Sequence, residues 1–330
     1  MLKNKGLSAP LLPYCIDWVE GWLLFINFRD KYMQLDLFVD NRANILLNIA
    51  DEYLLAQDYK KALSTCEQVR AEYPENRQAA GLCVAIKSWH AELAEAESAS
   101  SIPERLNEMC VNLGSVSHPP LRVAVMKSLA SLLQQLPEAD HIFIPPRFHL
   151  GHLLLECGRF AEAGRSFRNT LSSPDLGRGR FLAWSADAMT LGGNAEDAVT
   201  LYLQAFLEDP ATVDVHFIKH PAIQKLHQHC AENADGIDDD GVVAWLPVWG
   251  WLQGLFPLPL QHPPVFDELE ARIDGEESPL PKLWYELLTL AEHLRTMHRD
   301  DRQMAAVRRM MKRLNEEMFE CYMQRIRGTR

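Results

Sequence analysis

Three residues with metal-ligand chemistry lie close together in the sequence. His149, His152 and Glu156 are spaced at i, i+3 and i+7, which places them on one face of a helix. Imidazole and carboxylate groups bind zinc and similar ions, but such a site also needs a further ligand and supporting hydrogen bonds. Cys157 would point from a different face of the helix, so it does not complete the set. We therefore predict no metal ion and no cofactor for this chain.

The short motifs that accompany common enzyme chemistries are missing. The sequence holds no G-x-x-x-x-G-K phosphate loop, no G-x-G-x-x-G, no G-x-S-x-G and no H-E-x-x-H. His216 and His220 have the spacing of ligands, and His227 and His229 lie close in sequence, but twelve histidines in 330 residues produce such pairs by chance. We interpret these four as surface residues. The sequence therefore predicts that the protein is not an enzyme.

The composition of the chain indicates which classes of binding partner and which cellular compartment are expected. The formal net charge is −12, which repels phosphate backbones and disfavours a nucleic-acid partner. The seven cysteines are scattered and never spaced as C-x-x-C, which favours free thiols in a reducing cytoplasm. The stretch between Asp240 and Asp267 carries no charge apart from His262, but it contains five prolines. Prolines break helices, so we predict no transmembrane segment there.

A pattern of small residues, glycines and prolines occurs three times along the chain. A small residue and a later Ala stand 12 positions apart each time, at 50 and 62, at 151 and 163, and at 186 and 198. Small residues at such places let two helices pack closely. Gly158 and Gly193 suit the left-handed conformation that ends a helix, and Pro74 and Pro210 stop the helix that follows. Each set therefore predicts a hairpin of two helices.

These segments resemble the tetratricopeptide repeat (TPR) family. The matching residues are 43–76, 144–178 and 179–212. The resemblance implies an all-α solenoid of stacked helical hairpins. Residues 43–143 would hold one TPR hairpin followed by degenerate TPR-like helices, and residues 144–214 would hold two tandem hairpins. The degenerate helices are expected over Arg77–Glu97, Pro103–Leu113 and Pro120–Leu136.

Further helices are expected on both sides of the repeats. Ile16–Phe28 is apolar nearly all round, which predicts a buried helix within residues 1–42. Residues 215–330 are expected to form a helical C-terminal module outside the TPR pattern, ending in helices over Pro281–Met297 and Asp301–Ile326. Eight Lys or Arg residues fall within 302–330. The last helix is either a cap that closes the array or a basic surface for an acidic partner.

In TPR hairpins the first helix lines a concave groove, and the resemblance places eight residues in it. They are Asn48, Asp51, His149, His152, Glu156, Arg180, Trp184 and Asp187. This mixture of aromatic, imidazole and charged groups suits an extended peptide, although the same residues could be solvated or packed against the chain itself. We expect Trp184 to anchor the ligand and Arg180 to pair with a carboxylate. The histidines would make binding pH-sensitive if their pKa values lie near about 6.5.

Two functions from different classes follow. The first is a cytoplasmic, non-catalytic scaffold or adaptor that binds a segment of a partner protein in the groove. Only Arg180 matches the residues with which one TPR subgroup holds a C-terminal carboxylate, which disfavours that ligand. The alternative is a regulatory or assembly subunit that docks to an enzyme or membrane surface through residues 215–330. It rests on an apolar stripe that is either core or docking surface, at Trp245, Trp249, Leu252 and Phe256.

Overall fold

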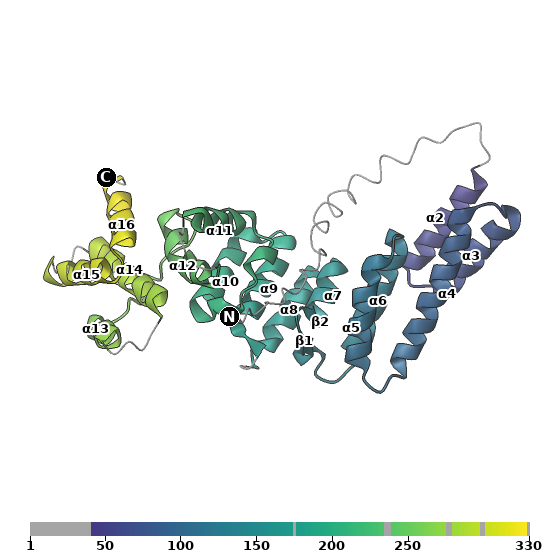
Figure 1. Ribbon diagram of the computed structural model, residues 1–330, viewed down its shortest axis with the longest axis horizontal. Coiled ribbons are helices and arrows are strands. Elements are labelled where there is room, and N and C mark those ends of the chain that lie inside the picture. Colours follow the sequence, from purple (N-terminus) through teal and green to yellow (C-terminus); the bar gives the residue numbers. More distant parts are fainter. Residues whose placement is uncertain (1–40, 174–175, 234–238, 275–278, 298–300, 329–330) are drawn as a thin grey trace, which may run out of the picture. The chain divides into compact units, whose positions relative to one another are not determined.

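The computed structural model describes residues 41–173, 176–233, 239–274, 279–297 and 301–328. These residues form fifteen α-helices, several short 3-10 turns and one β-hairpin whose strands have two residues each (Figure 1). The prediction of an all-α fold is confirmed. The helix expected over Ile16–Phe28 lies outside the described residues. The chain divides into two compact units, Met1–Lys87 and Ser88–Arg330.

The first unit contains a helical hairpin. Its helices α2 (Arg42–Leu55) and α3 (Tyr59–Glu72) pack against each other, and the small residues expected between them, Ala50 and Ala62, are fully buried. Asp58 caps α3, because its carboxylate accepts a hydrogen bond from the backbone N–H of Lys61 at 3.1 Å. The next helix, α4 (Arg77–Glu97), has the bounds that the sequence predicts, and the division between the units falls inside it.

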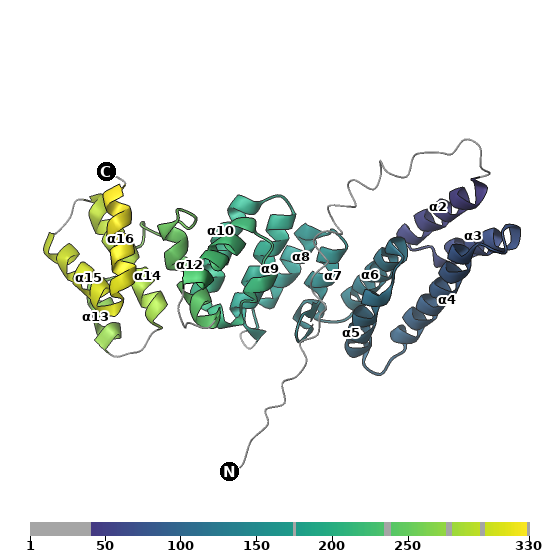
Figure 2. The same cartoon turned by 45° about the horizontal axis from the view of Figure 1, so that its top comes forward.

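From α5 to α10, the helices of the second unit pack in the order of the sequence. After α5 (Ile102–Asn112) and α6 (Pro119–Gln134), the chain forms four helices that each pack against the one before (Figure 2). These are α7 (Leu150–Glu156), α8 (Phe160–Thr170), α9 (Arg178–Leu191) and α10 (Ala195–Glu208). Both α5 and α6 have a proline in the first turn, where the missing N–H would have no partner inside the helix.

The turns after α2, α7 and α9 share one geometry. Each contains a residue in the left-handed conformation, namely Gln57 (φ 61°), Gly158 (φ 73°) and Gly193 (φ 90°). The N–H of the residue that follows then donates to a carbonyl five positions back, as in a Schellman cap. These bonds run from Asp58 to Tyr53, from Arg159 to Leu154 and from Asn194 to Met189. The sequence predicts Gly158 and Gly193 for this role, and the structure confirms both.

Replacing Gln57 by Gly is expected to stabilise the α2–α3 hairpin. A side chain at positive φ is strained, and the two equivalent turns use glycine. We expect Gln57→Gly to raise the free energy of unfolding by about 0.5–1 kcal/mol, measured by urea unfolding. The reverse change, Gly193→Gln, is the matched control, since a Cβ at 193 meets no atom within 4 Å and only the backbone strain acts. A loss of stability in Gln57→Gly would contradict this account.

The start of the 144–178 repeat differs from the prediction of a single first helix. Residues 143–149 form a β-hairpin in which β1 (Phe143–Ile144) pairs antiparallel with β2 (Phe148–His149), and α7 begins only at Leu150. Pro145 and Pro146 occupy the turn. Proline lacks the N–H that a helix uses and disfavours helical conformation in the residue before it. The predicted helix is therefore shortened, and His149 becomes the residue that caps it.

The C-terminal helices share a hydrophobic core with α9 and α10. The core contains Ala186 and Tyr202 from these two helices together with Trp284 and Tyr322 from farther along the chain. Its other elements are α11 (Pro221–Asn233), α12 (Asp239–Leu252), α13 (Phe266–Asp274) and α14 (Leu280–Met297). The stripe formed by Trp245, Trp249, Leu252 and Phe256 packs against this core, Phe256 being buried and the other three partly buried.

The prediction of one helix over Asp301–Ile326 is wrong, because the chain turns at Asn315. It forms α15 (Asp301–Leu314) and α16 (Glu316–Gly328), which pack together. The side chain of Asn315 accepts a hydrogen bond from the backbone N–H of Met318 at 2.9 Å and so caps α16. Val307, Met311, Met318 and Tyr322 enter the core. Within the ranges that the structure describes, no helix has the length and apolar character needed to cross a membrane.

Candidate functional site

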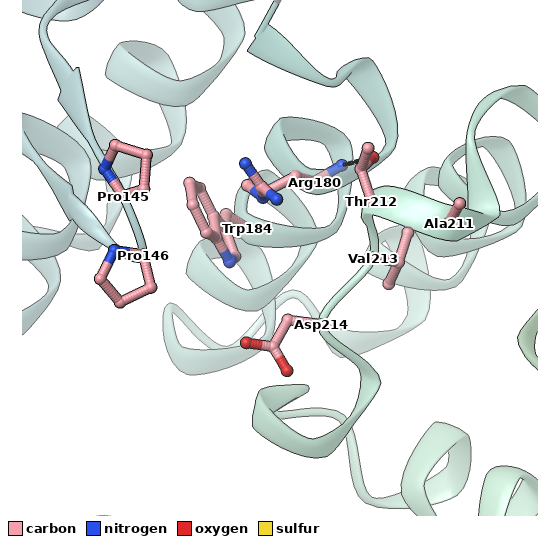
Figure 3. Close-up of a pocket in the computed structure, with 8 residues that line it drawn as sticks. All are labelled: Pro145, Pro146, Arg180, Trp184, Ala211, Thr212, Val213 and Asp214. Carbon is pink, nitrogen blue, oxygen red and sulfur yellow. Dashed lines mark hydrogen bonds between the residues drawn. The ribbon is translucent and has the colours of Figure 1, made fainter. Parts of the chain in front are cut away.

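The candidate site is a pocket of about 380 Å³ in the second unit (Figure 3). Its walls come from three places in the sequence, namely the β1–β2 turn, α9 and the loop after α10. The lining residues are Pro145, Pro146, Arg180, Trp184, Ala211, Thr212, Val213 and Asp214. Arg180 and Trp184 are thus two of the predicted groove residues that lie together.

The pocket wall that follows α10 in sequence is part of residues 209–220. Two hydrogen bonds attach this segment to α9. The backbone N–H of Arg180 donates to Thr212 Oγ1 at 3.1 Å, and the backbone N–H of Lys219 donates to Asp187 Oδ1 at 2.7 Å. Thr212 Oγ1 also donates to the Asp209 carboxylate at 2.8 Å. Both ends of the segment are therefore attached to α9 by hydrogen bonds.

Two arginines beside the pocket rest on aromatic rings. The Arg180 guanidinium lies 5.2 Å from the centre of the Phe143 ring and 5.8 Å from that of Trp184. The Arg147 guanidinium lies 4.1 Å from the centre of the Phe217 ring. Both side chains are half-buried, and neither has a carboxylate of the described residues at ion-pair distance. Stacking on rings restricts these cations without neutralising them.

Trp184 belongs to an aromatic cluster beneath the pocket. Its ring centre lies 4.3 Å from that of His152 and between 5.1 and 5.9 Å from those of three phenylalanines. These are Phe143, Phe167 and Phe181. The side chain is only 3% exposed. Its position indicates a structural role, because a buried ring cannot enter a pocket of a partner as an anchor.

His149 holds the β-hairpin against α8, since its ring stacks on that of Phe167 and its Nε2 lies 3.1 Å from the Thr170 hydroxyl. Its Nδ1 accepts a hydrogen bond from the N–H of Gly151 at 2.9 Å, and its Nε2 lies 2.7 Å from the carbonyl of Asp140. Burial lowers the pKa of His149 to about 4. Because both ring nitrogens are engaged, His149 is not available to a metal. No group of three or more His, Cys, Asp or Glu side chains is arranged to hold a metal ion in the described part of the chain.

His152 and Glu156 lie on α7 and face inward. Burial lowers the pKa of His152 well below its ordinary value, and burial raises the pKa of Glu156. Neither His149 nor His152 therefore titrates near pH 6 to 7, so the expected pH-sensitive binding does not rest on them. His220, interpreted from the sequence as a surface residue, is 8% exposed and lies against the Tyr202 ring.

Asp187 is a buried carboxylate that joins α9, α10 and the 209–220 segment. Its Oδ1 accepts hydrogen bonds from the Tyr202 hydroxyl at 2.5 Å and from the backbone N–H of Lys219 at 2.7 Å. Burial is the largest influence and raises the pKa of Asp187 to about 6, although these two bonds act in the opposite direction. The carboxylate is therefore a structural junction next to the pocket.

Replacing Asp187 by Asn is expected to change how stability depends on pH. The folded protein binds a proton at Asp187 up to about pH 6, whereas the unfolded chain releases it near pH 3.8. The carboxyl group therefore stabilises the fold at low pH, and this contribution is lost as the pH rises between these values. Asn can accept the same two bonds at Oδ1. We expect the unfolding free energy of Asp187→Asn, relative to wild type, to rise by on the order of 3 kcal/mol from pH 4 to pH 7.

The buried histidines titrate in both proteins, so their effect cancels in the difference between the unfolding free energies of variant and wild type. Asp197→Asn is the control, because Asp197 is exposed on the neighbouring helix. Urea unfolding at the two pH values measures the difference. A constant difference between Asp187→Asn and wild type would contradict a raised pKa at this position.

The remaining predicted residues, Asn48 and Asp51, belong to the first unit. Asn48 is exposed on α2, whereas Asp51 is half-buried, and burial raises its pKa to about 6. Sequence reasoning missed Arg147, Pro146 and the wall at 211–214 as parts of one site. The Pro145–Pro146 pair is the single local signal of a turn there. The chain matches no protein-family model, no curated protein and no solved structure.

Proposed function

We propose that this chain is a non-catalytic, TPR-like scaffold that binds a segment of a partner protein at the Arg180–Trp184 pocket. The observation that carries the proposal is a fixed, half-buried cation in a pocket bounded by prolines and by the 209–220 segment. The exposed prolines offer apolar contact, and Arg180 with Asp214 offers one charge of each sign. Such a lining suits an extended polypeptide.

The repeated architecture supports the TPR-like part of the proposal. Three hairpins share the same cap and bury the small residues that the repeat predicts, including Ala163 and Ala198. Helices that stack in chain order build extended surfaces for partners. We also assign the protein to the cytoplasm, in keeping with the six described cysteines, which are free thiols.

Site-specific photo-crosslinking in the full-length protein tests the proposal. A benzoylphenylalanine placed at Ala211, which is exposed in the pocket wall, should label a partner protein in cells that produce the chain. The matched control is the same group at Arg165, an exposed residue of α8 outside the pocket lining. We expect labelling at 211 and little at 165. Equal labelling at both positions, or none at 211, would reject the pocket as a partner site.

A second candidate function is docking through the C-terminal module, which the charge of α15 favours. Arg302, Arg309, Lys312 and Arg313 are all exposed on this helix, although the whole chain carries a net charge of −12. Such a face attracts an acidic surface. The same cross-linker at Arg309 distinguishes the two functions within one experiment. Full-length protein is needed because the shared core runs from Leu182 to Tyr322, and cutting the chain at 214 would divide it.

A further inference from the structure

Two cations beside the pocket have no ionic partner among the residues that the structure describes. Arg147 and Arg180 are half-buried, and neither side chain forms a hydrogen bond or ion pair with another residue of that part of the chain. Two other half-buried arginines are paired, Arg272 with Glu286 at 2.6 Å and Arg105 with Glu108 at 3.2 Å. A guanidinium that is partly removed from water and left unpaired costs free energy, which an incoming anion would recover.

The geometry points to an anionic side chain of the partner segment as the group that this pocket recognises, with Arg180 as its principal contact. This inference rests on the proposed function. The guanidinium presents a planar set of donors that fits a carboxylate or a phosphate through two parallel hydrogen bonds. The rings of Phe143 and Trp184 hold it in place, so little side-chain entropy is lost on binding. Arg147 supplies a second positive charge next to the Pro145–Pro146 turn.

Asp214 places a negative charge in the pocket that also contains the positive charge of Arg180. It lines the pocket across from the prolines, and no described cation lies at ion-pair distance from it (Figure 3). Burial raises the pKa of Asp214, and Arg147, His216 and Arg180 oppose that shift. Its carboxylate repels a second anion and accepts a hydrogen bond from a peptide N–H. We therefore expect the ligand to have an anionic group that contacts Arg180 and a hydrogen-bond donor that faces Asp214.

Peptide arrays test the chemical class without knowledge of the partner. The probes are heptapeptides with degenerate flanks, amidated C-termini and a central Ala, Gln, Lys, Glu or phosphoserine. A further set with central Gln has a free C-terminal carboxylate. We expect the full-length protein to bind the Glu or the phosphoserine set at least about tenfold better than the Gln set. A preference for Glu identifies a carboxylate as the natural group, and a preference for phosphoserine identifies a phosphate.

Variants assign the preference to Arg180. In Arg180→Gln the ratio of Glu or phosphoserine binding to Gln binding should fall to about one. Arg180→Lys should keep part of the preference, because the lysine ammonium group still attracts an anion as a point charge. Arg165→Gln, an exposed arginine of α8, is the matched control and should keep the full ratio. Circular dichroism of each variant confirms that the helices are retained.

Four results would overturn the inference. The first two are equal binding of the Glu, phosphoserine and Gln sets, and a preference that survives in Arg180→Gln. The third is a preference confined to the free C-terminal carboxylate. The fourth is a lack of binding to every set, since no anionic preference is then present. The proposed function fails by a different result, namely the absence of partner labelling at Ala211. The two failures are therefore distinguishable.

Discussion

Replacing Trp184 by Ala is expected to cost about 3–5 kcal/mol of folding stability. The indole is 3% exposed and packs among His152, Phe167 and Phe181. Its removal leaves a cavity that rigid neighbouring rings cannot fill. This result differs from the role of binding anchor that the sequence favours for Trp184, because an anchor would lose affinity while the fold stayed stable.

Urea unfolding and peptide binding, measured on the same preparations, separate the two roles. Trp249→Ala is the comparison for stability, since Trp249 is only partly buried and its ring contact is with His229 at 6.2 Å between ring centres. We expect a smaller loss there. If Trp184→Ala unfolds at the same urea concentration as wild type but binds peptides more weakly, Trp184 contacts the ligand and the structural role is wrong.

Helices and their ends could be predicted because local chemistry determines them. Gly158 and Gly193 adopt positive φ where the repeat places them, and α4 has the predicted bounds because its apolar spacing is regular and Ser-rich residues follow it. The break at Asn315 is harder to see. Asn is tolerated inside a helix, and only its bond to the N–H of Met318 turns it into a cap.

The inner and outer faces of the repeats could not be predicted in the same way. Nine residues of α9 are buried, including Trp184 and Asp187, because the helix packs against α8, α10 and the loop after α10. Its apolar residues therefore occur all round, and periodicity does not identify a free face. The family pattern alone assigned Trp184 and Asp187 to an open groove, and packing against distant parts of the chain places both inside.

The pocket could not be predicted from the sequence for a related reason. Its walls stand about 30 residues apart in sequence, and the bond from the Arg180 N–H to Thr212 spans 32 positions. No local pattern reports such a contact. Arg180 could be identified in the sequence as a charged residue on a largely apolar helix. Its contacts with the aromatic rings and the position of Asp214 in the same pocket were known only from the structure.

Replacing Gly179 by Ala is expected to disrupt the joint between α9 and the 209–220 segment. A Cβ at this position would overlap the backbone carbonyl oxygen of Asp209 and would lie 3.0 Å from Thr212 Oγ1. A backbone atom cannot move aside as a flexible side chain does, so α9 and the end of α10 must separate. We expect a loss of about 3 kcal/mol in the free energy of unfolding.

The same change should alter the pocket in the protein that remains folded. Thr212 is a pocket residue and accepts the N–H of Arg180, so moving it displaces one wall relative to the guanidinium. Gly164→Ala is the matched control, since a Cβ there makes only ordinary contacts, at 3.4 Å with the Arg168 side chain of α8 and at 3.6 Å with Ala188 of α9. Alanine should stabilise that helix by about 0.5–1 kcal/mol. Equal unfolding free energies for Gly179→Ala and wild type would show that the joint is less tightly packed than the structure indicates, and the pocket wall would then not be fixed before a ligand binds.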